Sequence, residues 1–496
     1  AEHFFRTSLD LNPGMSRAHH ELAELYRQEG HWTEAEREYL DAITLAKTGG
    51  DGGATRASIL LWSVRLASLL RERGDPLRSV DILNDVLLVE DLASAHYELA
   101  RSQFELCWER AAEAHYLHAT QLQPALGLHN PVRVASAKMD LIKDWCQAGN
   151  GHYVSLARSH PLILPPLKVN PSSAASSFMA GAAITPELGC ASIEDAEILP
   201  RDFAVLAKGR LFAGAVVNWF QHYPQRGQFV RQDTDDARLL LDLPSQVRKH
   251  DGGCVLLGGG GDYYAWLYEG LARLWTIEQM PSLANLPLVV PASVPKERLA
   301  MLQHFGAAGR RVLRLEEGCT LLARELHVPS LPILGDWVSP LALQFLRRRL
   351  GGGPSKAARR IYLSRQGLTD RRLSNEPAVV GLLDLHGFEV IRVGDTSPME
   401  LIDILRQARI VVGVDDESIA NLVVSPQGTH VGLIATAGAY RPRAHFICGQ
   451  LAQDLTYLVG ETVFESNPVH TLCDIRLHED VLLAFLQEVE KASPRI

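Results

Sequence analysis

A short pattern of residue types repeats near the start of the chain and limits the fold there. A small residue is followed by an aromatic residue four positions on, then by a second small residue, then by a proline or lysine. Residues at this spacing share one face of a helix, and small side chains on that face let a neighbouring helix approach closely. A period of about 34 residues is typical of stacked helical pairs. The pattern occurs in Ala1, Phe5, Ser8 and Pro13, in Ala35, Tyr39, Ala42 and Lys47, and in Ala112, Tyr116, Ala119 and Pro124.

The residues upstream of two of these patterns also match. The segment "HHELAELYRQEG" (19–30) has a counterpart in "HYELARSQFELC" (96–107). We therefore predict paired antiparallel helices to about residue 124, with Ala35, Tyr39, Ala112 and Tyr116 buried between them. An unrelated helical bundle is the alternative.

This region resembles the tetratricopeptide repeat, over about a quarter of the chain. The resemblance implies an α superhelix, placed at residues 1–150, whose concave face binds a protein partner or packs against a neighbouring domain of the same chain. Because the chain opens in the second half of a repeat, we expect a further helix to precede residue 1.

Length and composition limit the remaining classes of protein. At 496 residues with 46% hydrophobic residues, the chain is expected to form about three globular domains. The net charge of −9, without a long basic run, argues against a nucleic-acid partner. No apolar run is long enough to cross a bilayer, and residues 1–20 lack the features of a signal peptide. The seven cysteines are scattered without a Cys-x-x-Cys motif, which favours a reducing compartment and no structural zinc. We expect a soluble, cytoplasmic protein.

Four glycines follow an apolar segment in "CVLLGGGGDYYAWLYEGLARLW" (254–275). A strand, a glycine loop and a helix in this order can present backbone N–H groups to an anion. The loop does not fit the dinucleotide fingerprint, because its glycines lack the G-x-G-x-x-G spacing with a ribose-binding acid about 20 residues on. It does not fit the P-loop motif either, because no lysine follows the glycines. The alternative is that the glycines only allow a tight turn beside a sheet. We assign Gly259, Gly260, Gly261 and Tyr263 to the acceptor side of a cleft.

The last 140 residues alternate predicted strands with predicted helices, which indicates a parallel sheet covered on both faces. The preceding segment 160–177 is rich in proline and serine and is interpreted as a linker or a domain entry. The predicted strands are 360–364, 388–393, 409–414 and 429–434, and the predicted helices are 377–387, 397–408 and 417–424. Ser397, Pro398 and Glu400 form a predicted capping box.

Polar residues cluster where these strands end, and ligands of such sheets bind beyond the carboxyl ends of the strands. The fork of an arginine suits a diphosphate, whereas asparagine and carboxylates suit the hydroxyl groups of ribose or a sugar. A solvated charged face is the alternative. The candidate donor-binding residues are Ser364, Arg365, Arg371, Asn375 and Glu376 after one strand, and Asp415, Asp416, Ser418 and Asn421 after another.

Several segments of the second half occur in a distinctive order: "RIYLSR", "RRLSNE", "GFEVIRV", "ELIDILRQARIVVGV", "IAN" and Gly428. In this order they resemble the carboxyl-terminal half of glycosyltransferase family 61, and "DYYAWLYEGLARLW" resembles its amino-terminal motif. The similarity covers roughly residues 185–490. It implies two facing Rossmann-like lobes, the GT-B arrangement, and inverting transfer of a sugar from a nucleotide donor. We place the acceptor lobe at residues 151–345 and the nucleotide-sugar lobe at 346–496.

The chain departs from the family pattern at two places. Ala265 stands where the family has the histidine of a His-Trp-Leu motif, and Asp415, Asp416, Glu417 and Ser418 stand where it has His-Gly-Ala-Gly. Three acids would repel a diphosphate. They would face ribose and sugar hydroxyls, or the donor differs, or the site is inactive.

Inverting transfer needs a base that takes the proton of the acceptor hydroxyl. Asp262 is the first candidate, although it is equally suited to capping a helix, and Glu269, seven residues on, is expected on the same helical face. "DTDDAR" (233–238) contains an Asp-x-Asp spacing that binds metal in another transferase class, but the spacing is common in loops. Because the histidines show no ligand spacing, we expect no required metal or other cofactor besides the nucleotide-sugar substrate.

Two hypotheses from different classes follow. The first is a glycosyltransferase acting on a protein or glycan acceptor, with repeats that recruit the acceptor or a partner protein. The second is a repeat scaffold whose transferase half is inactive, as the two replaced histidines suggest. A nicotinamide-dependent oxidoreductase rests only on alternating strands and glycines, and the missing fingerprint argues against it.

Overall fold

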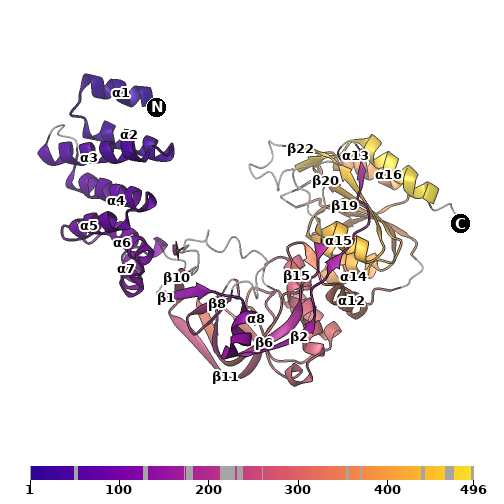
Figure 1. Ribbon diagram of the computed structural model, residues 1–496. Helices are drawn as coiled ribbons and strands as arrows, with labels where there is room; N and C mark the ends of the chain where they lie inside the picture. The colour runs from indigo at the N-terminus through magenta and orange to yellow at the C-terminus, as the bar shows by residue number, and fades with distance from the viewer. Residues whose placement is uncertain are drawn as a thin grey trace.

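The protein consists of a stack of helices followed by two sheets with their covering helices (Figure 1). This computed structural model describes residues 2–49, 54–126, 132–172, 174, 183–200, 202–212, 229–231, 238–259, 261–353, 357–368, 371–436, 442–463 and 474–492. None of the described helices is long and apolar enough to span a membrane.

The amino-terminal region is helical, as the repeat pattern predicts. Its helices pack as neighbours along the chain, and the pairs α2 with α3, α4 with α5 and α6 with α7 make the most extensive contacts. Asp75 caps α5 by accepting a hydrogen bond from the backbone of Arg78, and Pro76 opens that helix. The helices are α1 (Glu2–Leu11), α2 (Ser16–Gln28), α3 (Trp32–Thr48), α4 (Arg56–Glu72), α5 (Pro76–Leu87), α6 (Ala93–Glu105) and α7 (Glu109–Leu122).

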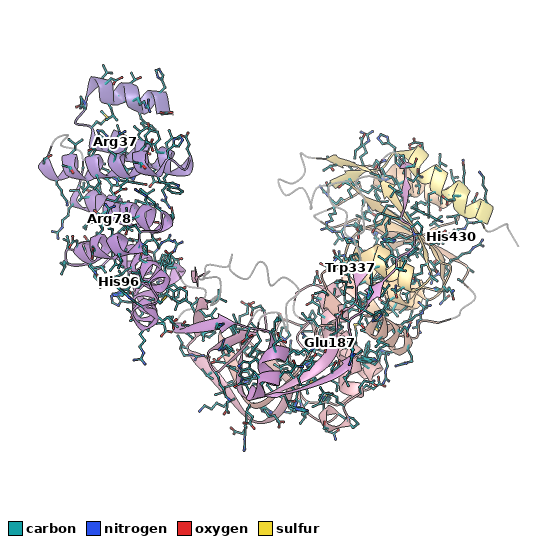
Figure 2. The ribbon with its side chains drawn as sticks, in the orientation of Figure 1. Arg37, Arg78, His96, Glu187, Trp337 and His430 are labelled. Atoms are coloured by element: carbon teal, nitrogen blue, oxygen red, sulfur yellow. The ribbon has the colours of Figure 1, made fainter. Side chains whose placement is uncertain are left out.

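The four residues that the pattern predicts to be buried are buried, which confirms the prediction: Ala35, Tyr39 and Ala112 are fully buried and Tyr116 is 2% exposed. Charged residues join neighbouring repeats at the surface. Arg78 of α5 (labelled in Figure 2) donates to Glu36 of α3 over 2.8 Å.

The last repeat packs against the sheet that follows it. Phe104 of α6 and Tyr116 of α7 share a hydrophobic cluster with Leu240 of the sheet. At this end, therefore, the repeats contact a neighbouring part of their own chain.

The larger sheet has eleven strands and is mixed. Its strands β11, β12, β13 and β14 run parallel, β14 then pairs antiparallel with β6, and β2 also pairs with β6. In spatial order the strands are β13 (Val312–Leu315), β12 (Leu288–Pro291), β11 (Gln246–Leu256), β14 (Cys319–Pro329), β6 (Leu188–Ile198), β7 (Val205–Ala207), β8 (Arg210–Phe212), β1 (Val132–Met139), β10 (Arg238–Pro244) and β9 (Phe229–Arg231), with β2 (His152–Ala157) beside β6.

The smaller sheet has six strands, all parallel. Each strand predicted after residue 360 is present, and Ser397 and Glu400 form the predicted capping box of α14. The strand order reverses between β17 and β19, because β18 lies on one side of β17 and the later strands lie on the other. In spatial order the strands are β18 (Glu389–Arg392), β17 (Arg359–Ser364), β19 (Ala408–Val414), β20 (His430–Ala435), β21 (Asp454–Val459) and β4 (Lys168–Asn170).

Short helices and two-stranded ribbons complete the fold. The helices are α8 (Ile142–Trp145), α9 (Tyr263–Ala265), α10 (Leu274–Glu278), α11 (Lys296–Ala300), α12 (Pro340–Arg349), α13 (Glu376–Leu385), α14 (Pro398–Leu405), α15 (Arg443–Gln450) and α16 (Glu479–Ala492). The 3₁₀ segments are η1 (Pro124–Leu126), η6 (Leu271–Arg273), η7 (Pro281–Leu283), η8 (Met301–Phe305) and η9 (Glu417–Val424), and the π segments are η2 (Cys146–Asn150) and η5 (Trp266–Gly270). The ribbons pair β3 (Pro161–Leu162) with β5 (Ala183–Ile184), β15 (Ile333–Leu334) with β16 (Trp337–Val338), and β22 (Glu461–Val463) with β23 (Asp474–Arg476).

The boundaries between the helical repeats and the two sheets differ from those expected from the sequence. The repeat helices end at Leu122, and β1 already belongs to the larger sheet, so the change comes before residue 150. Strand β4 lies in the proline-rich segment interpreted as a linker or a domain entry, and it pairs with β21 of the smaller sheet. Backbone pairing with a distant strand overrides the local composition there.

One hydrophobic cluster joins the two sheets. It includes Val255 and Leu288 from the larger sheet and Leu363, Val411 and Leu433 from the smaller one. Trp337 of β16, labelled in Figure 2, packs on Phe446 of α15 with ring centroids 5.6 Å apart.

Candidate functional site

A cavity of about 420 Å³ lies where the glycine-loop segment meets the smaller sheet. Its walls come from the segments that follow β17, β18 and β19, from α14, and from the start of α9. This is the edge of the sheet at which the strand order reverses, and open parallel sheets bind ligands in the crevice at that point. The volume falls in the range of small-molecule sites. The lining residues are Asp262, Tyr263, Arg298, Arg365, Leu368, Arg371, Val393, Gly394, Thr396, Pro398, Leu401, Asp416, Glu417, Ser418, Asn421 and Arg443.

The cavity brings together seven of the residues singled out from the sequence: Asp262, Tyr263, Arg365, Arg371, Asp416, Ser418 and Asn421. Seven others do not line it: Gly259, Gly261, Glu269, Ser364, Asn375, Glu376 and Asp415. Gly260, and the Asp233 and Asp235 of the Asp-x-Asp motif, lie outside the described residues.

Three of the residues that do not line the cavity make hydrogen bonds inside the smaller sheet's own structure. Glu376 accepts hydrogen bonds from Tyr362 at 2.9 Å and from Ser364 at 2.7 Å. The amide of Asn375 donates to the carbonyl of Leu477 and accepts from its N–H, at 2.7 and 3.1 Å. These contacts hold α13 against β17 and β23.

The acidic segment after β19 is built into the sheet edge. Asp416 caps η9 by accepting hydrogen bonds from the backbone and the hydroxyl of Ser418, at 2.8 and 2.5 Å. Asp416 also forms an ion pair with Arg365, and both side chains are buried. Arg371 donates to the backbone carbonyl of Asp415 over 3.1 Å. Arg365, one of the two arginines expected to bind a diphosphate, therefore has a carboxylate beside it.

Two further arginines, which were not among the residues predicted from the sequence, also line the cavity. Arg443 is 5% exposed and its guanidinium stacks over Tyr264, 4.7 Å from the ring centroid. Its Nε is buried and has no hydrogen-bond partner among the described residues. Arg298 donates to the carbonyl of Gly261 over 3.1 Å. Each arginine follows a parallel strand, β20 or β12, so the rule about carboxyl ends of strands could have found both.

The glycine loop is shaped by close packing. Gly258, Gly259 and Gly261 have φ of 67°, 77° and 94°, a region that favours glycine. A Cβ on Gly259 would lie 2.9 Å from the Trp266 ring and 3.1 Å from the backbone of Gly270. Beneath the loop, the fully buried Arg273 donates to the carbonyl of Leu257 over 2.8 Å. These contacts support the interpretation of a tight turn beside the sheet.

The loop segment is fixed to the smaller sheet by hydrogen bonds from tyrosines. The hydroxyl of Tyr263 donates to Asn421 over 2.6 Å, and that of Tyr268 donates to the carbonyl of Ala420 over 2.8 Å. The backbone N–H of Tyr263 donates to Glu417 over 3.2 Å. These hydrogen bonds fix the positions of the two cavity walls relative to one another.

Three acids lie on or near the glycine-loop wall, and they differ in environment. Asp262 is exposed, lines the cavity and caps α9 by accepting from the N–H of Ala265 over 2.7 Å. Burial, and next the charge of Asp262, raise the pKa of Glu417. Glu269 does not line the cavity. The helix after Asp262 winds as a π segment with more residues per turn, so a seven-residue spacing does not keep Glu269 on the face of Asp262.

Burial raises the pKa of Glu269 to about 7, which makes stability depend on pH. The folded protein then holds this proton more tightly than the unfolded chain between about pH 4 and pH 7. Compared with the ionised form, the protonated Glu269 stabilises the folded protein by on the order of 3 kcal/mol. This stabilisation is fully present below the unfolded pKa and is lost as the pH rises through the folded pKa. We expect the wild type to lose more stability between pH 5 and pH 8 than Glu269→Gln, as measured by denaturant unfolding at both values.

The exposed Glu297, for which Glu297→Gln is the control, should show the pH dependence of the wild type. If Glu269→Gln also keeps the wild-type pH dependence, Glu269 ionises normally in the folded protein.

No group with the spacing of metal ligands lines the cavity among the described residues. The two groups of histidine and carboxylate side chains with such spacing lie in the helical repeats. The six cysteines that the structure describes are free.

Comparisons with known proteins identify one part of the chain. No curated protein matches it. A solved structure described as "Crystal structure of YrrB: a TPR protein with an unusual peptide-binding site" is 14% identical, with a TM-score of 0.21 over 25% of this chain. The chain covers 59% of that protein's length. Residues 263–432, which provide much of the cavity wall, match the model of the family Glycosyltransferase 61. The chain therefore consists of helical repeats followed by a domain that matches glycosyltransferase family 61.

Proposed function

We propose that the protein transfers a sugar from a nucleotide-sugar donor to a protein or glycan acceptor, with inversion at the anomeric carbon. The observation that carries this proposal is the cavity at the strand-order reversal, lined by four arginines within or beside the family-matching region. Arginine binds phosphate oxygens in a forked geometry, and a nucleotide sugar carries a diphosphate.

On the donor side, Arg443 and Arg371 are the best placed to hold the diphosphate. Arg443 is nearly buried, and its Nε has no hydrogen-bond partner in the described chain, so a phosphate oxygen would satisfy it. Arg365 lies beside Asp416, and this carboxylate would offset part of its attraction for a phosphate. Ser418 and Asn421 would contact hydroxyl groups of the ribose or the sugar.

On the acceptor side, Asp262 is the proposed base. The acceptor oxygen would attack the anomeric carbon as the bond to the diphosphate oxygen breaks, and the hydroxyl proton would pass to the carboxylate. Glu417 lines the same cavity, and its raised pKa brings it closer to the neutral range in which a base works well. Glu417 is therefore the second candidate.

The two sheets would act as the facing lobes of a GT-B arrangement, with the larger sheet on the acceptor side. The repeats would recruit the acceptor or a partner protein, because stacked helical pairs present extended surfaces for peptides. We also propose that the enzyme works in the cytoplasm without a required metal. The free state of the six described cysteines fits a reducing compartment.

A specific observation favours a second candidate, the inactive scaffold. The acidic segment that replaces the family's His-Gly-Ala-Gly places Asp416 on Arg365, so one cation of the cavity is already neutralised. If the remaining arginines do not bind a nucleotide, the repeats alone would carry the function.

Nucleotide binding distinguishes the two candidates. Thermal unfolding should be followed with a panel of nucleoside diphosphates and nucleotide sugars, because a ligand at 100 times its Kd adds about 2.7 kcal/mol of stability. Arg443→Ala should weaken donor binding by about 1.5–3 kcal/mol, or roughly 10- to 150-fold. Arg443→Lys should recover only part of this, because lysine keeps the charge but loses the fork.

The exposed Arg311 provides the control, since Arg311→Ala removes an arginine that does not line the cavity. This variant should bind the donor as the wild type does. Absence of nucleotide binding by the wild type would argue for the scaffold.

A further inference from the structure

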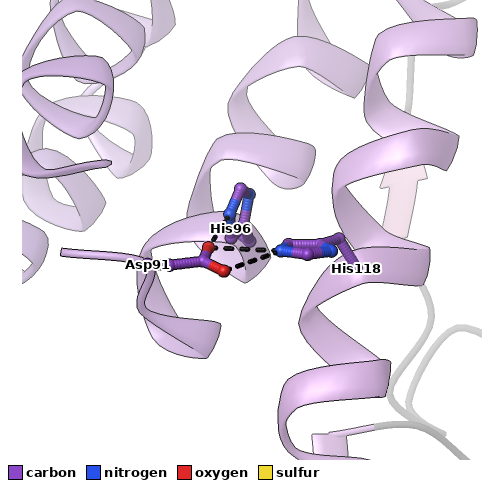
Figure 3. Close-up of side chains that lie close together, drawn as sticks. All are labelled: Asp91, His96 and His118. Carbon is purple, nitrogen blue, oxygen red and sulfur yellow. Dashed lines mark hydrogen bonds and ion pairs between the residues drawn. The ribbon is translucent and has the colours of Figure 1, made fainter. Parts of the chain in front are cut away.

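Asp91, His96 and His118 form a cluster of histidine and carboxylate side chains in the helical repeats (Figure 3), and none of them lines the cavity of the proposed transferase site. Asp91 comes from the turn between α5 and α6, His96 from the first turn of α6 and His118 from α7. The Nε2 of His96 lies 2.7 Å from Asp91 Oδ1, and the Nε2 of His118 lies 3.1 Å from Asp91 Oδ2. One ligand atom from each residue lies within 4.8 Å of the others.

The spacing of these atoms is close to that of a tetrahedral metal site. With zinc bonds to nitrogen and oxygen of about 2.0–2.2 Å, neighbouring ligand atoms lie about 3.3–3.5 Å apart. The contact of His118 with Asp91 is already near this distance. The contact of His96 with Asp91 needs to open by roughly half an ångström, which a side chain in a turn can provide. The three residues come from separate elements, so no His-x-x-x-His spacing is visible in the sequence.

A fourth residue stands behind His96 in the place of an outer-shell partner. The Nδ1 of His115 lies 2.8 Å from the Nδ1 of His96, and the two rings stack with centroids 4.9 Å apart. Of these two nitrogens one must donate and the other accept. If His96 donates from Nδ1, its neutral Nε2 carries a lone pair that points at Asp91, and a cation between them resolves the repulsion. Metal-ligating histidines commonly donate their second N–H in this way.

We propose that Asp91, His96 and His118 bind one divalent transition-metal ion, zinc being the best fit, with His115 holding the ring of His96 in the ligating tautomer. Two imidazoles and one carboxylate favour zinc over magnesium or calcium, which prefer oxygen ligands. Asp91 and His118 have side chains that are 58% and 42% exposed, so water can complete the coordination. The ion would join the turn before α6 to α7 and would stabilise the last repeat against unfolding.

The second group of candidate ligands, His19, Glu38 and Asp41, fits less well. It offers a single imidazole, and Arg37 already donates to Glu38 over 3.0 Å.

Zinc binding by the full chain, without a polyhistidine tag, tests the proposal. Zinc chloride should bind with one equivalent per chain in calorimetric titration and raise the melting temperature, whereas magnesium chloride should not. His118→Ala and Asp91→Asn should each weaken zinc binding by more than about 100-fold, because losing a ligand costs more than losing an outer-shell partner. The side chains of His118 and Asp91 are about half exposed, so these variants should fold, as far-UV circular dichroism would show.

Two histidine variants serve as controls. His31→Ala removes an exposed histidine of the repeats that belongs to neither cluster, and His19→Ala disrupts the second cluster. Both should bind zinc as the wild type does. The proposal is overturned if the wild type binds no zinc, if His118→Ala keeps wild-type affinity, or if His19→Ala abolishes the binding.

A variant of His115 tests whether this residue holds the ring of His96 in the ligating tautomer. His115→Phe keeps an aromatic ring against His96 but removes the acceptor for its Nδ1–H, so zinc binding should weaken by about 10- to 100-fold. Cobalt chloride should give visible absorption bands of a low-coordinate site in the wild type and altered bands in His115→Phe. Unchanged affinity and bands in this variant would contradict the role of His115.

Discussion

Gly259→Ala should lower the free energy of unfolding by about 2–5 kcal/mol. A left-handed backbone conformation costs a residue with a Cβ about 1–2 kcal/mol, and Gly259 has a φ of 77°. The new methyl group would also lie 2.9 Å from the Trp266 ring and 3.1 Å from the Cα of Gly270, and crowding of this kind costs about 1–3 kcal/mol. Trp266 is fully buried and cannot move aside easily. Denaturant unfolding followed by tryptophan fluorescence measures the loss.

Gly261→Ala is the matched control in the same loop. Gly261 has a φ of 94°, but a Cβ there meets nothing within 4 Å. Gly261→Ala should therefore lower the free energy of unfolding only by the cost of the left-handed backbone conformation, about 1–2 kcal/mol. Equal losses in the two variants would show that the packing of Gly259 against Trp266 and Gly270 contributes nothing.

Asp416→Asn should destabilise the protein by about 3–5 kcal/mol, the usual cost of removing one charge from a buried ion pair. Asp416 and Arg365 are 4% and 8% exposed, so water cannot replace the lost carboxylate. Asparagine can still accept the hydrogen bonds from Ser418 that cap η9, so the change isolates the charge. The same variant should bind nucleoside diphosphates more tightly, because a negative charge leaves the cavity wall.

An exposed ion pair of the same sheet provides the comparison. Glu389 accepts two hydrogen bonds from Arg359 at the surface, and Glu389→Gln should cost about 1 kcal/mol or less. If Asp416→Asn is no more destabilising than Glu389→Gln, the buried pair does not hold the sheet edge together.

Local patterns were enough to predict the elements whose stabilising contacts are near in sequence. The repeat spacing correctly predicted the burial of Tyr39 and Tyr116, since helical periodicity determines which side chains face a neighbouring helix. The alternation after residue 360 predicted the parallel strands, and Ser397 and Glu400 predicted the start of α14. The carboxyl ends of the strands in turn indicated where the candidate donor-binding residues Arg365 and Asp416 would lie, and both line the cavity.

Features that depend on distant contacts or on unusual winding were not predictable in this way. The π segment after Asp262 changes the face on which Glu269 lies, and no residue pattern signals it. The position of Arg443 after a parallel strand was visible in the sequence, but its stacking on Tyr264, a contact between segments far apart in the chain, was not. Asp415 follows its strand as expected, but it does not line the cavity that Asp416 lines. Adjacent residues on an extended backbone face opposite ways.

Strand β4 has a consequence for the order in which the chain can acquire its structure. It pairs with β21, and the side chain of its last residue, Asn170, donates to the carbonyl of Val481, across a sequence separation of 311 residues. During synthesis this edge strand leaves the ribosome long before its partner exists, and closing so long a loop is slow. Until then its hydrogen-bonding groups are open to other strands. We therefore expect chains shortened before β21 to aggregate more readily than the full chain, because β4 then has no strand of its own chain to pair with.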